Sequence, residues 1–478
     1  MLDSRTGLAP RGVVRPHLPL GVVVAISCLA QFTVVLDATI VTLALPDMRA
    51  SLDMSASQQQ WVVSGYLIAF GGFLLLAARA GDLFGYRRVF LAGAVIFTLA
   101  SLAGGLATSP WMLLVARVFQ GLGAAALSPT SLNLITASHS DEDRRERAVT
   151  LWSLMGALSS VAGLILGGVL TAGLSWHWVM FVNVPPGLIL LVAGLLWLLP
   201  DRDTGERRRL DLPGALTATL GIGALTYGFS EVATDGWTET NVLVALIAAA
   251  VLLIGFVAVE AKSRHPLIPL TIFRLRTVSI GNFLIFCMGV TMTAGMVLLS
   301  LYFQEALDYD PFTTGLSLLP MSAIVIAGGL GARQLLPRVG TRPLLLAGGL
   351  VTTVGLLWMT RMPAEPAYLT HVLGPTLVTG LGMSLLLPAA TVTSTTGVAP
   401  GDDGAASGLL NTSRQIGGAV GLAVLVTIAT TTTERALPDT TPVKAIVDGF
   451  HTAFLANAAV MLAATLVALA LPRSGRQS

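Results

Sequence analysis

Charged residues are scarce in this chain. Asp, Glu, Lys and Arg make up 11% of its 478 residues, 54% are hydrophobic, and the mean hydropathy is +0.77. A water-soluble domain of ordinary composition carries about 25% charged residues. A fold of this length cannot cover a water-facing surface with so few polar groups. The composition therefore excludes a soluble globular protein and indicates an integral membrane protein.

Cysteine and histidine are also few. The two cysteines, Cys28 and Cys287, both fall in apolar runs, and the six histidines are scattered along the chain. A disulfide framework or a metal site needs ligand residues at a suitable spacing, and this pattern offers none. We interpret the cysteines as small buried side chains and expect no metal and no cofactor.

The chain has neither a basic stripe nor a long polar segment. Its net charge is +2, and the basic residues sit in short scattered segments, which argues against nucleic-acid binding. None of the segments between the apolar runs is long enough to fold as a separate domain. A soluble enzyme anchored in the membrane is therefore disfavoured.

Long apolar runs dominate what is present. A helix needs about 20 apolar residues to cross a bilayer, and the chain contains about fourteen runs of that kind. The sequence therefore predicts an all-α integral membrane protein. The expected spans are residues 18–46, 58–78, 89–108, 111–132, 149–171, 179–199, 213–232, 241–260, 278–303, 312–332, 343–360, 369–391, 405–429 and 449–471.

The arginines and lysines predict the orientation. An even number of spans places both termini on one side, and the segments on that side hold 22 of the 28 basic residues. The segments on the other side hold 4, and Arg117 and Arg414 lie inside spans. Because basic residues concentrate on the cytoplasmic side, both termini are expected there, in a multi-pass protein of the inner (cytoplasmic) membrane.

An internal repeat divides the chain. The tripeptide Gly-Leu-Gly at 121–123 recurs at 380–382, each followed by a proline eight residues after its first glycine. Gly-Tyr-Arg at 85–87 likewise recurs as Gly-Thr-Arg at 340–342, again between equivalent spans. Repeats of this kind are typical of transporters. We predict two pseudo-symmetric six-helix bundles and two inserted helices, divided as a cytoplasmic tail (1–17), an N-terminal bundle (18–199), a cytoplasmic linker with the inserted pair (200–260), a C-terminal bundle (261–471) and a second tail (472–478).

Two charged residues lie at similar depths in the first bundle. At 1.5 Å per residue, Asp37 is about 12 Å and Arg117 about 10 Å from the outer ends of their spans. Pairing would offset part of the cost of burying both charges. Gln120, one turn after Arg117, shares its helix face and can extend the polar patch. In the repeat, Thr376 stands where Arg117 would be expected, so the arginine serves more than packing.

Asp37 is a candidate proton carrier, because a carboxyl group can be neutral or ionised and a moving arginine can change its proton affinity. We expect Asp37 to load and release the proton and Arg117 to modulate it. The alternative is a static ion pair that joins two helices. Arg414, also deep in a span, is a possible pathway residue together with Gln120, and its partner cannot be named from the sequence.

These residues belong to a set of motifs that resembles the 14-span drug:proton antiporter branch of the major facilitator superfamily. The resemblance covers nearly the whole chain. Residues 117–123 resemble motif B, whose arginine that family associates with proton coupling. The other matching segments are 36–46 in the first span, 79–88 (motif A), 162–168 (motif C), 176–187 and 411–418.

Motif A lies between the second and third spans. The resemblance implies that it acts as a conformational latch, carried by Gly81, Asp82, Gly85, Arg87 and Arg88. The two glycines permit a tight turn, and we expect Asp82 to cap the following helix.

Motif C is the motif of antiporters in that family. Gly156, Gly163 and Gly167 recur at spacings of seven and four on one helix face, and Gly168 follows. Small residues let helices approach closely, which suits a sliding contact between bundles. Leu164 stands where the family has proline, so a weaker kink is expected here.

The resemblance implies a proton-coupled antiporter that exports drug-like or antibiotic molecules by alternating access. A proton-coupled transporter of one physiological metabolite or lipid is the alternative. A membrane-embedded enzyme or scaffold is a third class, but the spans show no catalytic constellation. The expected partners are a small-molecule substrate, protons and the lipid bilayer, with the protein acting as a monomer.

Overall fold

The computed structural model describes residues 20–138, 141–198, 211–263, 266–363, 368–398 and 403–471. Throughout these residues the regular structure is helical, without strands, which confirms the all-α prediction. The expected tails (1–17 and 472–478) and linker residues 200–210 lie outside the described residues.

Fourteen helical spans account for the described chain, as the apolar runs predicted. One span is broken between Phe181 and Val184, and two others contain short π-helical segments. Their bounds are α1 Leu20–Leu52, α2 Ala56–Phe84, α3 Tyr86–Gly105, α4 Pro110–Ser138, α5 Glu142–Gly173, α6 His177–Phe181 with α7 Val184–Trp197, α8 Leu212–Asp235, α9 Thr240–Lys262, α10 Arg276–Gly289 continued by η2 Val290–Ala294, α11 Gly295–Leu301 and η3 Tyr302–Ala306, α12 Pro311–Val339, α13 Thr341–Met359, η4 Tyr368–Val372 with α14 Leu373–Thr395, α15 Asp403–Ala436 and α16 Pro442–Ala468. A short helix, η1 (Leu270–Arg274), precedes α10.

Within the described residues, thirteen spans are long and apolar enough to cross a membrane on their own, and α8 is not among them. The sequence of α8 is diluted by threonines, glycines and Glu231. Two of its polar side chains, Thr226 and Ser230, are buried and face the protein. The helix therefore depends on its neighbours, α9 above all, to cover it in a bilayer.

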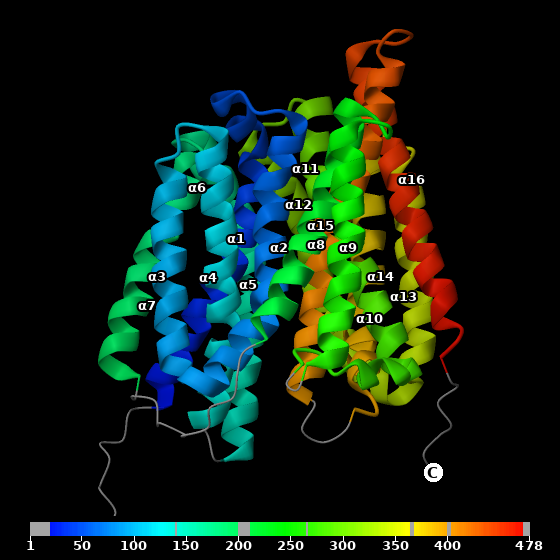
Figure 1. Cartoon of the computed structure of the whole chain (residues 1–478). Helices are drawn as coiled ribbons and strands as arrows, with labels where there is room; N and C mark the ends of the chain where they lie inside the picture. Colours follow the sequence, from blue (N-terminus) through cyan, green and yellow to red (C-terminus); the bar gives the residue numbers. More distant parts are fainter. Residues whose placement is uncertain are drawn as a thin grey trace, which may run out of the picture.

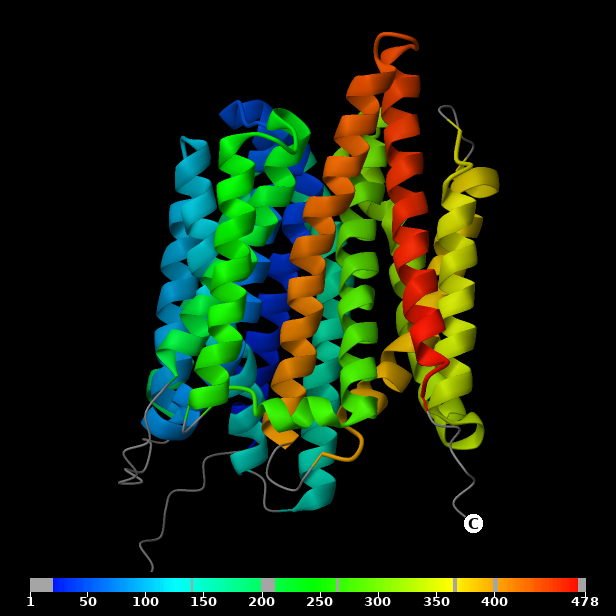
Figure 2. The same ribbon diagram turned by 45° about the vertical axis from the view of Figure 1, so that its right-hand side comes forward.

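The helices stand side by side and form two groups (Figure 1). Helices α1–α7 (blue to green-cyan) form one group, and α10–α16 (green to red) form the other. The first residue of α1 and the last residue of α16 lie at the same end of the molecule, which we call the lower end after Figure 1. The opposite end is called the upper end. Turned by 45°, the molecule shows α8 and α9 (green) standing beside α15 (orange) (Figure 2).

Matching contacts confirm the repeat between the groups. A Cβ on Gly123 would lie 2.7 Å from the backbone nitrogen of Phe97, and one on Gly382 would lie 2.4 Å from that of Thr352. Both glycines thus let two helices touch backbone to backbone, α4 against α3 and α14 against α13. The Gly-Leu-Gly repeat was a packing signal.

The two groups meet along two pairs of helices. On one side α2 packs on α15, where the Thr412 hydroxyl donates to the carbonyl of Gly71 at 3.0 Å. On the other side α5 packs on α12 near the upper end, where a Cβ on Gly315 would meet the carbonyl of Leu164. Helix α8 bridges the groups, because it packs on both α2 and α15.

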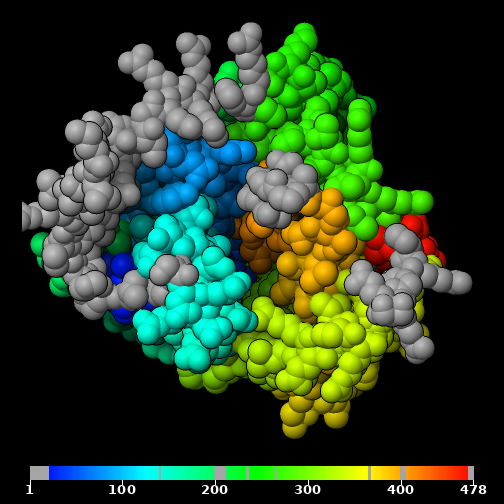
Figure 3. All heavy atoms as spheres, turned by 90° about the horizontal axis from the view of Figure 1, so that it is seen from below, coloured from blue at the N-terminus to red at the C-terminus, as the bar shows by residue number. Residues whose placement is uncertain are grey.

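The lower end is open between the groups. Viewed from below, the surface is hollowed between the cyan helices α4 and α5 and the yellow-green helix α12 (Figure 3). A cavity of about 370 Å³ lies there, lined by Thr136, Glu142, Arg145, Glu146, Val149, Thr150, Ser153 and Arg333. On this side the groups touch near the upper end and part at the lower end, whereas on the other side Leu75 of α2 and Gly408 of α15 remain in contact.

Candidate functional site

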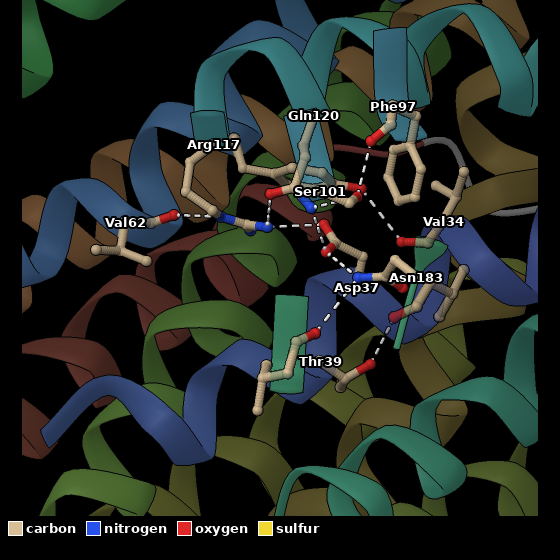
Figure 4. Close-up of polar contacts among 12 residues, drawn as sticks. Val34, Asp37, Thr39, Val62, Phe97, Ser101, Arg117, Gln120 and Asn183 are labelled. Carbon is tan, nitrogen blue, oxygen red and sulfur yellow. Dashed lines mark hydrogen bonds and ion pairs between the residues drawn. The ribbon is translucent and has the colours of Figure 1, made fainter. Parts of the chain in front are cut away.

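Asp37 of α1 lies at the centre of a buried polar network. Its Oδ2 accepts from Arg117 Nη1 at 2.7 Å, and its Oδ1 accepts from Gln120 at 3.0 Å and from Asn183 at 2.8 Å. All four side chains are fully buried. The ion pair expected from the matching depths of Asp37 and Arg117 therefore forms, and Gln120 joins it (Figure 4).

Arg117 of α4 is held on three sides. Besides Asp37, it donates from Nε to the carbonyl of Val62 at 2.8 Å and from Nη1 to Gln120 at 3.0 Å. Its guanidinium lies 4.4 Å from the centre of the Tyr66 ring, within the range of a cation–π contact. The positive charge is thus compensated by a carboxylate, two carbonyl-type oxygens and an aromatic face.

Close packing of α4 on α2 positions this arginine. A Cβ on Gly121 would lie 2.3 Å from the carbonyl oxygen of Tyr66. Only glycine permits that approach, which brings Arg117 within reach of the backbone of α2. The glycine of motif B therefore serves the geometry of its arginine.

Three residues of the network were not predicted from the sequence. Asn183 stands between α6 and α7, just before the two prolines that break this span. Ser101 of α3 accepts from Gln120 at 2.9 Å, and the Tyr66 hydroxyl donates to Val34 at 3.2 Å. An asparagine inside an apolar run was the available signal, but neutral polar residues are common enough in such runs that it did not stand out.

Proton binding to Asp37 would change the contacts of this network. Asp37 is the carboxylate, and its two oxygens accept from three donors, Arg117, Gln120 and Asn183. A proton on Oδ2 would compete with Arg117 for that oxygen. Protonation and the position of Arg117 are therefore linked, and a shift of α4 against α1 would change both.

The second group has a neutral counterpart of this network. Asn457 of α16 lies twelve residues before Leu469, just as Asn183 lies twelve before Leu195. Asn457 accepts from the Thr291 hydroxyl at 2.9 Å. Thr376, in the place of Arg117, bonds only to its own helix, through the carbonyl of Leu373. Among the described residues, the buried ion pair belongs to the first group.

Motif A forms the turn between α2 and α3 at the lower end. Gly85 has φ of +97°, which favours glycine, and a Cβ on Gly81 would lie 2.7 Å from the ring of Tyr86. The expectation that Asp82 caps α3 is wrong: the cap position, Gly85, has no side-chain hydrogen bond. Asp82 instead accepts from the Tyr86 hydroxyl at 2.7 Å, because that ring covers its helix turn.

Arg87 ties this turn to the end of α7. It donates to the carbonyls of Gly194 at 3.3 Å and Leu195 at 2.9 Å. Arg342 does the same in the second group, donating to Leu469 of α16 at 2.8 Å. The neighbouring Arg88 is exposed.

The glycines of motif C face two different helices. Cβ atoms on Gly163 and Gly167 would lie 2.8 Å from Thr39 and from the carbonyl of Ile40, both on α1, and Gly156 faces Gln31 of the same helix. Gly168 faces α12, where the Cα of Phe312 is 2.8 Å away. The expected contact between bundles is wrong for Gly156, Gly163 and Gly167, which join α5 to α1 within the first group. Gly168 alone of the four lies where the two groups touch.

Arg414 of α15 lies apart from the Asp37 network. It donates to Asn411 of its own helix at 3.2 Å, while its Nε is buried without a hydrogen-bond partner. Asn411 is therefore a hydrogen-bond partner of Arg414, and Arg414 does not contact Gln120. Across the described residues, no three His, Cys, Asp or Glu side chains cluster as metal ligands would.

Comparisons with known proteins agree with this architecture. Residues 27–422 match the Major Facilitator Superfamily. The cephamycin export protein CmcT of Amycolatopsis lactamdurans is 39% identical over 456 residues, which cover 95% of this chain and 93% of that protein. The puromycin resistance protein pur8 of Streptomyces alboniger is 40% identical over 426 residues, covering 88% and 84%.

Solved structures share the fold at low sequence identity. The xylose transporter XylE from E. coli, in a partially occluded inward open conformation, matches with a TM-score of 0.63 and 12% identity over 96% of this chain and 99% of its own. An auto inhibited POT family peptide transporter matches with a TM-score of 0.66 and 15% identity over 96% and 98%. With fourteen helical spans in its described residues and an internal repeat, the chain belongs to the Major Facilitator Superfamily and is a multi-pass membrane transporter rather than an enzyme.

Proposed function

We propose that this transporter exports drug-like or antibiotic small molecules across the cytoplasmic membrane in exchange for protons. The observation that carries the proposal is the Asp37–Arg117 pair, fully buried at 2.7 Å and present in one bundle only. A buried charge that packing does not require is costly, and in a membrane it usually marks function. The relatives named for cephamycin export and puromycin resistance support an antibiotic as the substrate class.

The proton step follows from the contacts of Asp37. A proton that enters on Oδ2 displaces Arg117, which keeps its bonds to Val62 and Gln120. The neutral carboxyl holds α4 to α1 less firmly than the ion pair does. Proton loading thus favours one arrangement of α1 against α4, and proton release favours the other.

The two bundles supply the alternating access. In this conformation α5 touches α12 near the upper end, and a cavity of about 370 Å³ opens at the lower end. The basic residues of the lower end support a cytoplasmic location for it under the positive-inside rule. The cavity then admits substrate from the cytoplasm, and the contact of Gly168 with Phe312 must part to release it outside.

The remaining motifs have supporting roles in this scheme. Arg87 and Arg88 of motif A act as a conformational latch at the cytoplasmic end, and Gly156, Gly163 and Gly167 let α5 slide along α1. Gln120 extends the proton site. Arg414 lines the substrate pathway with its unpartnered Nε. The transporter works as a monomer.

The test uses inside-out vesicles with an acidic lumen, in which lumenal pH is followed while a panel of antibiotics and lipophilic compounds is added. We expect a substrate to raise the lumenal pH, and Asp37→Asn to abolish that response. Asp47→Asn is the matched control, because Asp47 is on the same helix and exposed. A full response from Asp37→Asn would contradict the role of that residue. Silence towards every compound, with correctly inserted protein, would favour a single physiological metabolite or lipid.

A further inference from the structure

Two buried carboxylates meet at the lower end of the inserted helix pair, far along the chain from Asp37. Asp211 caps α8, and its Oδ1 accepts from the backbone nitrogen of Gly214 at 2.9 Å. Glu260 lies near the end of α9, and its Oε2 accepts from the backbone nitrogen of Ile268 at 3.2 Å. The residues are 8% and 3% exposed. The second oxygen of each, Asp211 Oδ2 and Glu260 Oε1, is buried without a hydrogen-bond partner.

Gly214 makes room for this meeting. The position that a Cβ on Gly214 would occupy is 2.8 Å from Glu260 Oε1 and 3.0 Å from Asp211 Oδ1. The two carboxylates therefore flank one point in space. Any larger residue at 214 would push them apart.

Each carboxylate thus leaves one oxygen without a donor in the part of the chain that the structure describes, and a buried polar atom without a hydrogen bond is costly. Three acidic or metal-binding side chains do not come together in the described residues, so a metal cage of protein ligands is not formed here. Within the described chain, the site lacks a hydrogen-bond donor for these two oxygens. A single proton on one carboxyl supplies it, because the resulting O–H group can donate to an oxygen of the other.

The two carboxylates could instead be neutralised by a nearby cation, so the charged groups around them in the described part of the chain matter. The described ionisable group that acts electrostatically on Glu260 is Asp211. On the nearby elements, Lys262 of α9, Arg274 of η1 and Arg79 of α2 are all exposed. Among the described residues, neither Asp211 nor Glu260 forms an ion pair, and no cation acts electrostatically on Glu260.

We propose that Asp211 and Glu260 share one bound proton and form a second proton-binding site, separate from Asp37, that senses pH at the lower end. The site controls the segment from residue 266 to η1, because Glu260 holds the backbone of Ile268. This segment joins α9 to α10 at the lower end (Figure 2). The inference does not depend on the proposed transport function.

Loss of the proton has a defined structural consequence. Two adjacent buried charges repel, and the carboxylates separate or take up water. The bond from Ile268 to Glu260 is then strained. Leu267, Ile268 and Ile272 pack in one apolar cluster with Leu75 of α2 and Leu409 of α15. The pH signal therefore reaches both bundles through this cluster.

The first test is infrared difference spectroscopy on the purified full-length protein in lipid nanodiscs, titrated from neutral to alkaline pH. We expect a protonated-carboxyl band at neutral pH that disappears on titration and is lost in Glu260→Gln. The band persists in Asp37→Asn and in Glu239→Gln, a control at the exposed opposite end of α9. A Glu260→Gln spectrum identical to the wild-type spectrum would overturn the proposal. Loss of the wild-type band on adding Mg²⁺ or Ca²⁺ at constant pH would also overturn it, in favour of a cation site.

The second test follows hydrogen–deuterium exchange of the peptide that contains Ile268, corrected for the intrinsic effect of pH. Wild-type exchange rises at alkaline pH, whereas Glu260→Gln, which keeps an acceptor for Ile268 and a donor for Asp211, stays protected. If Glu260→Gln does not express, Asp211→Asn serves instead and must show the same loss of pH dependence. Equal pH dependence in wild type and variant would refute the proposed control of this segment.

Discussion

Asn183 and Asn457 occupy equivalent places in the two bundles and bind different partners. Asn183 donates to the carboxylate of Asp37 at 2.8 Å, whereas Asn457 accepts from the hydroxyl of Thr291 at 2.9 Å. Asn183 belongs to a charged hydrogen-bond network, and Asn457 belongs to a neutral one. The repeat has thus kept the polar position and changed its chemistry, which restricts the proposed proton step to the first bundle.

This difference predicts opposite outcomes for the same substitution. Asn183→Ala removes one of the two donors to Asp37 Oδ1, so we expect substrate-driven proton movement to fall by an order of magnitude or more in vesicles. Asn457→Ala is the matched control and should leave proton movement per substrate unchanged. Equal losses in both variants would mean that the asparagines act through packing alone.

Removing Arg117 should be more harmful than removing the whole ion pair. Arg117→Ala leaves a buried carboxylate unpaired, which costs about 3–5 kcal/mol when one partner of a buried pair is lost. Adding Asp37→Asn removes that charge, so the double variant should unfold at a higher temperature than Arg117→Ala alone. Thermal unfolding in detergent, followed by tryptophan fluorescence, measures the difference. Additive losses would show that the two side chains do not interact energetically.

Gly85 should resist substitution because of its backbone. With φ of +97° and ψ of 141°, it occupies a region that costs other residues about 1–3 kcal/mol. We expect Gly85→Ala to lower the unfolding temperature, and Gly340→Ala, at φ of +87°, to do the same. Gly223→Ala in α8, where nothing lies within 4 Å, is the control and should be neutral or stabilising. An unchanged Gly85→Ala protein would contradict a backbone role for motif A.

The sequence predicted the helices and the central ion pair because both leave strong signals. A charge in an apolar run is conspicuous, and helix rise converts its position into depth, so Asp37 and Arg117 could be paired on paper. The contacts of Asn183 and Arg87 could not be predicted. The first depends on where the span breaks between α6 and α7, and the second depends on where α7 ends. Asp82 does not cap α3, because Gly85 occupies the cap position and the Asp82 carboxylate accepts from the Tyr86 hydroxyl instead.

Asp310 should stabilise the upper contact in a pH-dependent way. It caps α12 outside the membrane, and the Thr313 hydroxyl, with the backbone of Thr313 and Phe312, lowers the pKa of its carboxyl. A lowered pKa means that the stabilisation is complete above the ordinary carboxyl pKa and is lost as pH falls through the folded value. Asp310→Ala should cost about 0.5–2 kcal/mol at neutral pH. The difference in unfolding temperature should shrink on acidification, and a difference that grows in acid would reverse this assignment.

Gly168 should control which end of the transporter is open. A Cβ there would lie 2.8 Å from the Cα of Phe312, so a large side chain cannot fit while α5 and α12 touch near the upper end. Gly168→Trp should force that contact apart and close the lower cavity.

Ser153 lines this cavity, so Ser153→Cys, in a background with Cys28→Ser and Cys287→Ser, reports its accessibility. We expect an impermeant thiol reagent in inside-out vesicles to label Ser153→Cys readily, and several-fold more slowly once Gly168→Trp is added. Gly173→Trp, at the end of the same helix with nothing within 4 Å, is the control and should not change labelling. Unchanged labelling with Gly168→Trp would show that the lower cavity opens independently of the α5–α12 contact, and it would remove the mechanical basis for alternating access through motif C.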